Sequence, residues 1–177
     1  MIITEHRIRD IVAEIPGFDL NADYLNVKPK FGWGDKFELD RYLALKKSDS
    51  YPLIWLLPSP EKHSEDFRLC QRSCTLIIAM LEKDISLFND QRYLKSYDLV
   101  LNPLTNYLVE GIRAANITYL NEQEDNWDIE KIPNYSENNY GGTERTSNAT
   151  IDLWDAVQLD CNIEFNNEPL NKIFWAI

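Results

Sequence analysis

The sequence predicts a small domain of the α/β (α+β) class, in which an N-terminal helix and a long central helix pack on a mixed, mainly antiparallel sheet. Three observations lead to this expectation: two continuous apolar runs of strand length, one segment that alternates strictly between apolar and polar residues, and two segments with apolar residues at intervals of three and four. A chain of 177 residues is long enough to bury one core without metals or disulfides, so we expect a single domain over 1–177.

The first helix is predicted near the N-terminus. Thr4 is a suitable N-cap, and the Pro16-Gly17 pair stops the helix. The apolar positions between these signals fall on one stripe, and they are Ile8, Ile11, Val12 and Ile15. We expect this stripe to dock on the sheet.

The strands are predicted from two kinds of pattern. Residues 51–58 and 74–81 are continuous apolar runs, typical of strands buried on both faces, and the polar residues 59–69 are predicted to form a connecting loop. Residues 157–165 alternate between apolar and polar, which indicates a strand with one face on the core. A further strand is expected over 36–45.

The central helix is predicted over 91–115 from apolar residues at helical intervals. Pro103 interrupts this segment, so we expect a kink or two helices, with Asn102 capping the second and Pro103 at its first position.

Residues 121–148 are polar and acidic but contain aromatic side chains that a solvated linker would not need. An extended arm that packs on a neighbour and a local hairpin are both compatible with this composition. The residues 167–177 form an apolar C-terminal tail, which suggests a docked terminus.

Large aromatics dominate contacts between chains, and the candidates for partner or oligomer contacts are Trp127, Tyr135, Tyr140, Phe174 and Trp175. The remaining tryptophans, Trp33, Trp55 and Trp154, are assigned to the core.

The charge and the cysteines exclude several classes of protein. The formal net charge is −11, with no basic cluster, so the surface would repel nucleic acid instead of gripping it. The cysteines Cys70, Cys74 and Cys161 are odd in number and are expected to be free, buried thiols. No apolar run reaches the length of a membrane span, and the first residues lack the pattern of a signal peptide, so we expect folding in a cytoplasm.

No catalytic or metal-binding motif stands out. His6 on the first helix and His63 in the polar loop are expected to be ordinary surface residues, and Asp152 and Asp155 beside Trp154 do not by themselves indicate a glycosidase. We therefore expect no catalytic residues, no metal and no cofactor, and a protein that is not an enzyme. A small hydrolase would need a deep pocket with perturbed carboxylates, or His63 facing a cysteine.

The order of elements resembles that of the bacteriophage tail-terminator and tail-completion proteins, which are head–tail joining proteins of the virion neck. The resemblance rests on the Tyr-Pro-Leu-Ile-Trp-Leu run at 51–56, Leu-Asn-Pro-Leu at 101–104, and Leu-Trp-Asp-Ala-Val at 153–157 leading into the alternating strand. It covers residues 3–166 and rests on the order of these elements.

The resemblance implies a structural subunit of the virion, made in the host bacterial cytoplasm, that forms a ring and binds no membrane. The ring would be a hexamer, with a dodecamer as the alternative. It would end the tail, contact the portal or connector and the tail proteins, and let DNA pass through its lumen without specific binding. Two other functions remain open: a head-closure or connector ring of a short-tailed phage, and a cytoplasmic acidic module that binds a basic protein.

Overall fold

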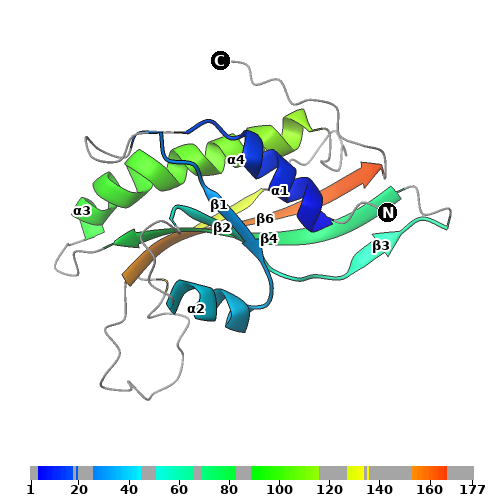
Figure 1. Cartoon of the computed structure of the whole chain (residues 1–177), viewed down its shortest axis with the longest axis horizontal. Helices are drawn as coiled ribbons and strands as arrows, with labels where there is room; N and C mark the ends of the chain where they lie inside the picture. Colours follow the sequence, from blue (N-terminus) through cyan, green and yellow to red (C-terminus); the bar gives the residue numbers. More distant parts are fainter. Residues whose placement is uncertain are drawn as a thin grey trace.

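The computed structural model confirms the predicted fold class: helices pack on a six-stranded mixed sheet (Figure 1). It describes residues 4–17, 19, 26–44, 51–65, 69–82, 89–115, 127–133, 135 and 153–166. In chain order the elements are α1 (Thr4–Glu14), β1 (Lys30–Trp33), α2 (Lys36–Ala44), β2 (Leu53–Leu56), β3 (Glu61–His63), β4 (Leu69–Glu82), α3 (Asn89–Arg92), the π-helical segment η2 (Tyr93–Leu101), α4 (Asn102–Ala114), β5 (Asp128–Ile132) and β6 (Leu153–Asn166).

The sheet has the strand order β1-β2-β4-β6-β5, and β3 pairs with the first part of β4. Only β1 and β2 are parallel, while every other pairing is antiparallel. β4 and β6 are the central strands, and their register runs without a break from Leu69 opposite Asn166 to Glu82 opposite Leu153. The short strand β3 lies in the segment 59–69 that the sequence analysis assigned to a loop.

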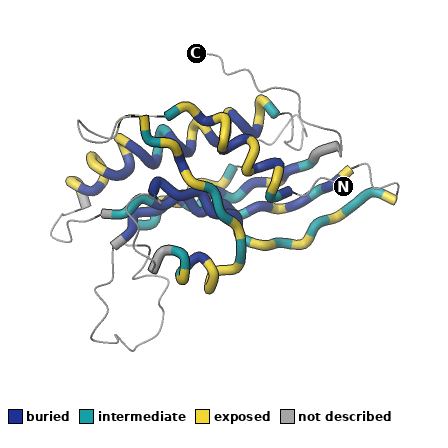
Figure 2. The backbone as a smooth tube through the Cα atoms, in the orientation of Figure 1, coloured by how far each residue is buried: buried dark blue, intermediate teal, exposed yellow. Residues whose placement is uncertain are grey.

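One face of the sheet is covered by α1, η2 and α4, and we call it the helical face (Figure 1). The predicted stripe of α1 is buried there against apolar residues of β2, β4 and β6, and α1 also packs on α4. The three cysteines lie on this face as buried free thiols, as predicted. The dark blue stretches of the central strands and of the long helix in Figure 2 mark this core.

α2 covers part of the opposite face and corrects one expectation, because residues 36–44 form a helix and not a strand. Its start is fixed by a capping box, in which Glu38 N–H donates to Asp35 Oδ1 over 2.8 Å and Asp35 N–H donates to Glu38 Oε2 over 3.0 Å. Leu39 anchors the helix in a second core cluster with Trp55 and Trp154. Both tryptophans are therefore core residues, as expected, whereas Trp33 is 47% exposed and its assignment to the core is wrong.

The central helix is interrupted where Pro103 predicts it, although the form of the break differs. The turns before the proline are π-helical, and Asn102 N–H donates to Tyr97 O, five residues back. A proline ring clashes with the carbonyl four residues earlier in an α-helix, and the wider turn accommodates the ring. Asn102 continues the helix and does not cap it, and its side chain donates to Asp98 Oδ1 over 3.2 Å.

Part of the predicted arm belongs to the sheet of its own chain. Within 121–148, residues 128–132 form the edge strand β5, which pairs with β6. Tyr135 is buried in the second core cluster. For this part of the segment the structure therefore favours packing within the subunit over an extended arm, while the rest of 121–148, apart from Trp127 and Pro133, and the tail 167–177 lie outside the described residues.

Candidate functional site

Part of the second sheet face carries no helix among the described residues. Side chains alternate between the two faces along a strand. The residues two, four and six positions before Ile77 of β4, and those two, four and six positions after Gln158 of β6, therefore share the face that α2 covers further along. Polar side chains that are exposed or half-buried occupy this area, which we call the open polar face: Gln71, Ser73 and Thr75 of β4, Gln158, Asp160, Asn162 and Glu164 of β6, and Asp128 and Glu130 of β5.

Hydrogen bonds between opposite residues tie β4 to β6 across the open polar face. Ser73 Oγ donates to Asn162 Oδ1 over 2.6 Å, and Thr75 donates in the same way to the carboxylate of Asp160. Gln71 donates its side-chain amide to Glu164 at the end of the series. These rows hold the polar side chains in fixed positions, so the face is preorganised.

The open polar face is acidic. It carries four carboxylates, on Asp128, Glu130, Asp160 and Glu164, and the donors described above are neutral hydroxyl and amide groups. Lys62 of β3 lies opposite Gln71 and so belongs to the same face. Among the described residues of β3 to β6, it is the basic side chain on this face. The face therefore presents a negative potential and repels polyanions.

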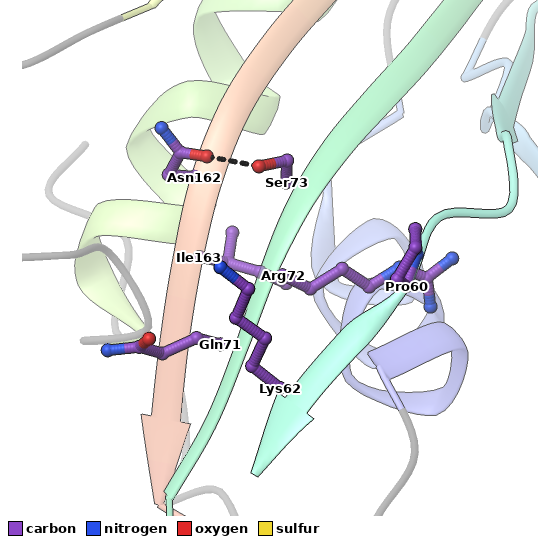
Figure 3. A pocket seen from close by; sticks show the side chains of 7 residues that line it. All are labelled: Pro60, Lys62, Gln71, Arg72, Ser73, Asn162 and Ile163. Atoms are coloured by element: carbon purple, nitrogen blue, oxygen red, sulfur yellow. Dashed lines mark hydrogen bonds between the residues drawn. The ribbon is translucent and has the colours of Figure 1, made fainter.

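A hollow of about 270 Å³ lies where β3, β4 and β6 meet (Figure 3). Its lining is mostly polar and consists of Pro60, Lys62, Gln71, Arg72, Ser73, Asn162 and Ile163. Ser73 is the hydroxyl side chain in it, and its partner is the amide of Asn162, drawn as a dashed line in Figure 3. An amide oxygen cannot take up a proton near neutral pH, so the pair does not make an activated nucleophile.

A second group of polar residues, the Glu61 cluster, lies under the N-terminus of α1 and consists of Glu61, His63 and Cys70. His63 and Cys70 are cross-strand partners, and Glu61 is two residues before His63, so the three share a face. Glu61 Oε2 lies 3.4 Å from His63 Nε2, and one ligand atom from each residue falls within 4.8 Å of the others. Carboxylate, imidazole and thiolate are the ligands that zinc takes in proteins, so the cluster has the donor set of a metal site.

Arg72 gives the Glu61 cluster a structural explanation. Its buried guanidinium Nη1 lies 2.7 Å from Glu5 Oε1 and 3.3 Å from Glu61 Oε1, and Thr4 at the start of α1 also donates to Glu61. Burial alone would raise the pKa of Glu61, but the hydrogen bond from Thr4 and the charge of Arg72 outweigh it and lower that pKa. The carboxylate is thus held ionised by an ion-pair network that joins α1 to β3 and β4, and a cation would have to bind beside the guanidinium.

His63 faces Cys70 across strands β3 and β4, which is the arrangement that a small hydrolase would need. The protonation state of the thiol, however, does not suit a catalytic cysteine. Cys70 is buried, and burial is the first of the causes that raise the pKa of its thiol. A catalytic cysteine needs a lowered pKa, because the thiolate is the nucleophile. Asp155, the other carboxylate considered for catalysis, is paired with Arg92 in the core.

The structure places two of the five predicted contact residues. Trp127 packs against the helical-face core with Arg113 stacked 5.7 Å from its ring centroid, and Tyr135 is buried in its own subunit. Tyr140, Phe174 and Trp175 lie outside the described residues. The β4 side of the open polar face was not predicted, because the strand was expected to begin at residue 74, whereas β4 begins at Leu69 and includes Gln71 and Ser73.

Comparison with known proteins supplies no family for this chain. No model of a protein family matches it, and a search of curated proteins finds no match. Among the described helices, none has the length and apolar character needed to span a membrane.

Proposed function

We propose that this chain is a structural subunit of a bacteriophage neck, where copies of it form a ring that ends the tail and joins it to the head connector. DNA passes through the lumen of this ring, the portal or connector and the tail proteins are its neighbours, and the assembled protein resides in the virion. The proposal combines the resemblance in element order with the properties of the described surface. The observation that supports it most is the open polar face.

A conduit for DNA has to avoid binding it. DNA is held by proteins that offer lysine and arginine to its phosphates, because such contacts release counterions. The open polar face offers the reverse, since it carries four carboxylates, and two of them, Asp160 and Glu164, accept hydrogen bonds from the neutral side chains of Thr75 and Gln71. A wall of this kind repels the phosphates at short range and leaves DNA free to slide.

The ladder that carries the open polar face is long and stiff, and the face itself occupies the part of it formed by residues 71–75 and 158–164. β4 and β6 each have 14 residues and are paired along their whole length, which corresponds to roughly 45 Å of continuous antiparallel ladder. The helices on the other face back this ladder with a single apolar core.

The test is the native mass of the purified protein, measured by light scattering over a concentration series and followed by electron microscopy of the largest species. A discrete ring with an open centre is the expected result, with six subunits as the first expectation and twelve as the second. A monomer at every concentration that binds a basic protein at a one-to-one ratio would instead favour the acidic binding module. In that case the open polar face would be its binding surface.

A further inference from the structure

Within the described residues, each edge of the sheet has one side that pairs with no other strand. These edges are β1 and β5, which lie at opposite ends of the strand order. An unpaired edge exposes a row of backbone N–H and C=O groups, which is a template for a strand from another chain.

The side chains of the two edges match on the helical face. Phe31 and Trp33 lie opposite Ile54 and Leu56, so both point to the helical face. The centroids of their two rings are 5.9 Å apart. On β5, Ile129 lies opposite Leu159 and therefore points to the same face, where it is 51% exposed. Each edge thus carries apolar surface that a strand partner would cover.

On the other face of the sheet, the two edges carry side chains of opposite charge. Lys30 lies opposite Leu53 and points away from the helical face, and it is exposed, as is Lys28 two residues earlier. Asp128 and Glu130 of β5 are opposite Asp160 and Gln158 and point to that same side. In a chain with a net charge of −11, two exposed bases on one edge and two exposed acids on the other favour contact between unlike edges.

The directions of the strands agree with such a contact. β1 and β2 are parallel, and the three following pairings along the sheet are antiparallel, so β1 and β5 run in opposite directions. If a second copy continues the sheet in the same orientation, its β1 meets β5 of the first copy in antiparallel fashion. This is the more stable arrangement of two strands.

We propose that β1 of one copy pairs antiparallel with β5 of the next copy, so that the sheet continues from subunit to subunit. The inference rests on the proposed function for the identity of the partner, which is another copy of this chain. In the register that places Phe31 opposite Ile129, Lys30 lies opposite Glu130. The apolar side chains then meet on the helical face, and the oppositely charged side chains meet on the other face. The contact is heterologous, so it generates a closed ring when the rotation between copies closes.

Strands of four and five residues give too small a contact for a stable interface, which needs about 1,200 Å² or more in total. The surface beside β1 supplies more apolar area, since Phe37 at the start of α2 is 76% exposed. We therefore assign the β1–α2 side of one subunit and the β5 side of its neighbour to a single interface.

The test exchanges the charges across this interface in the full-length protein. Lys30→Glu and Glu130→Lys each place like charges opposite one another, and each is expected to weaken self-association about tenfold or more. The double variant Lys30→Glu/Glu130→Lys restores the opposite signs and is expected to recover most of the association. Arg9→Glu/Asp10→Lys, which exchanges an exposed ion pair of α1, is the matched control and should assemble as the wild type does. Circular dichroism verifies that the variants fold, as expected for exposed positions.

A second measurement reports the register directly. Lys30→Cys combined with Glu130→Cys places two thiols opposite each other across the interface, close enough for a disulfide between copies. Oxidation should give a ladder of covalent multimers on a denaturing gel, whereas each single variant should not. The outcomes separate the two proposals. A wild-type ring that neither single charge variant weakens overturns the edge pairing alone, and a wild-type monomer at every concentration counts against both the ring and the edge pairing.

Discussion

The buried ion pair between Arg92 and Asp155 allows a quantitative prediction. Arg92 ends α3 and Asp155 lies on β6, and their side chains are 2% and 0% exposed. The guanidinium Nη1 is 3.4 Å from the carboxylate Oδ1, so the pair links the start of the central helix to the sheet. Asp155→Asn removes the negative charge at nearly constant volume and leaves a buried cation without its counter-charge.

Removing one partner of a buried ion pair costs about 3–5 kcal/mol. For a domain of this size we take a urea dependence of about 2 kcal/mol per molar, so the midpoint of urea unfolding should fall by roughly 1.5–2.5 M. The matched control is the exposed pair of Arg9 and Asp10, whose side chains are 49% and 55% exposed. Asp10→Asn should change the free energy of unfolding by less than about 1 kcal/mol.

A double variant separates the ion pair from simple loss of packing. Arg92→Met/Asp155→Leu replaces both charges with apolar groups of similar volume, and it should be clearly more stable than Asp155→Asn, because no uncompensated charge remains. If Asp155→Asn unfolds within about 0.5 M of the wild type, as the exposed control does, then the assignment of a stabilising buried pair is refuted.

Three further predictions follow from described contacts. Burial raises the pKa of the Cys74 thiol from 9.0 to about 12, so its contribution to stability is complete below pH 9 and is lost as the pH rises toward 12; at pH 10.5 the loss should be about 2 kcal/mol. Gly32→Ala should destabilise the protein by about 1–3 kcal/mol, because a Cβ at this position would lie 2.4 Å from the Trp55 ring. Cys70 should resist alkylation by iodoacetamide in the native protein at pH 7.5, because its thiol is buried and protonated.

Each of these predictions has a direct check. Urea unfolding at several pH values should give a flatter alkaline profile for Cys74→Ala than for the wild type, and equal profiles would show that the thiol does not contribute. For Gly32→Ala, a midpoint at or above that of the wild type would mean that the Trp55 ring moves aside at no cost. Fast alkylation of Cys70, mapped by mass spectrometry, would return the His63–Cys70 pair to consideration as a catalytic site.

The sequence predicts those parts of the fold where the hydrophobic pattern is strong and local. The stripe of α1 and the alternation in β6 each bury one side of an element, so their periodicity specifies both the element and its inward face. The helix α2 was not predicted: among its side chains that the structure describes, Leu39 is the fully buried one, and a single buried position gives no periodic signal. The informative signal was Asp35 and Glu38, whose spacing is that of a capping box.

The candidate surface could be predicted only in part, because it is a property of neighbouring strands. The polar residues of β6 alternate visibly, and a polar face was expected from them. Their partners Gln71 and Ser73 are far away in the chain, and only the register reveals that both strands contribute to one acidic surface. The match between β1 and β5 depends in the same way on knowing that these short segments are the two edges.

The pairing of β4 with β6 also sets the order of events during synthesis. Thr75 and its partner Asp160 are 85 positions apart, so at 5–20 residues per second β4 waits about 4–17 s for its main partner. During this interval β4 can pair only with β2 and β3, and one of its long edges is open to other nascent chains. The closure of such a distant contact is slow, so we expect the arrival of β6 to be the step that limits the yield of native protein. Chaperones that shield apolar strands would act in this interval.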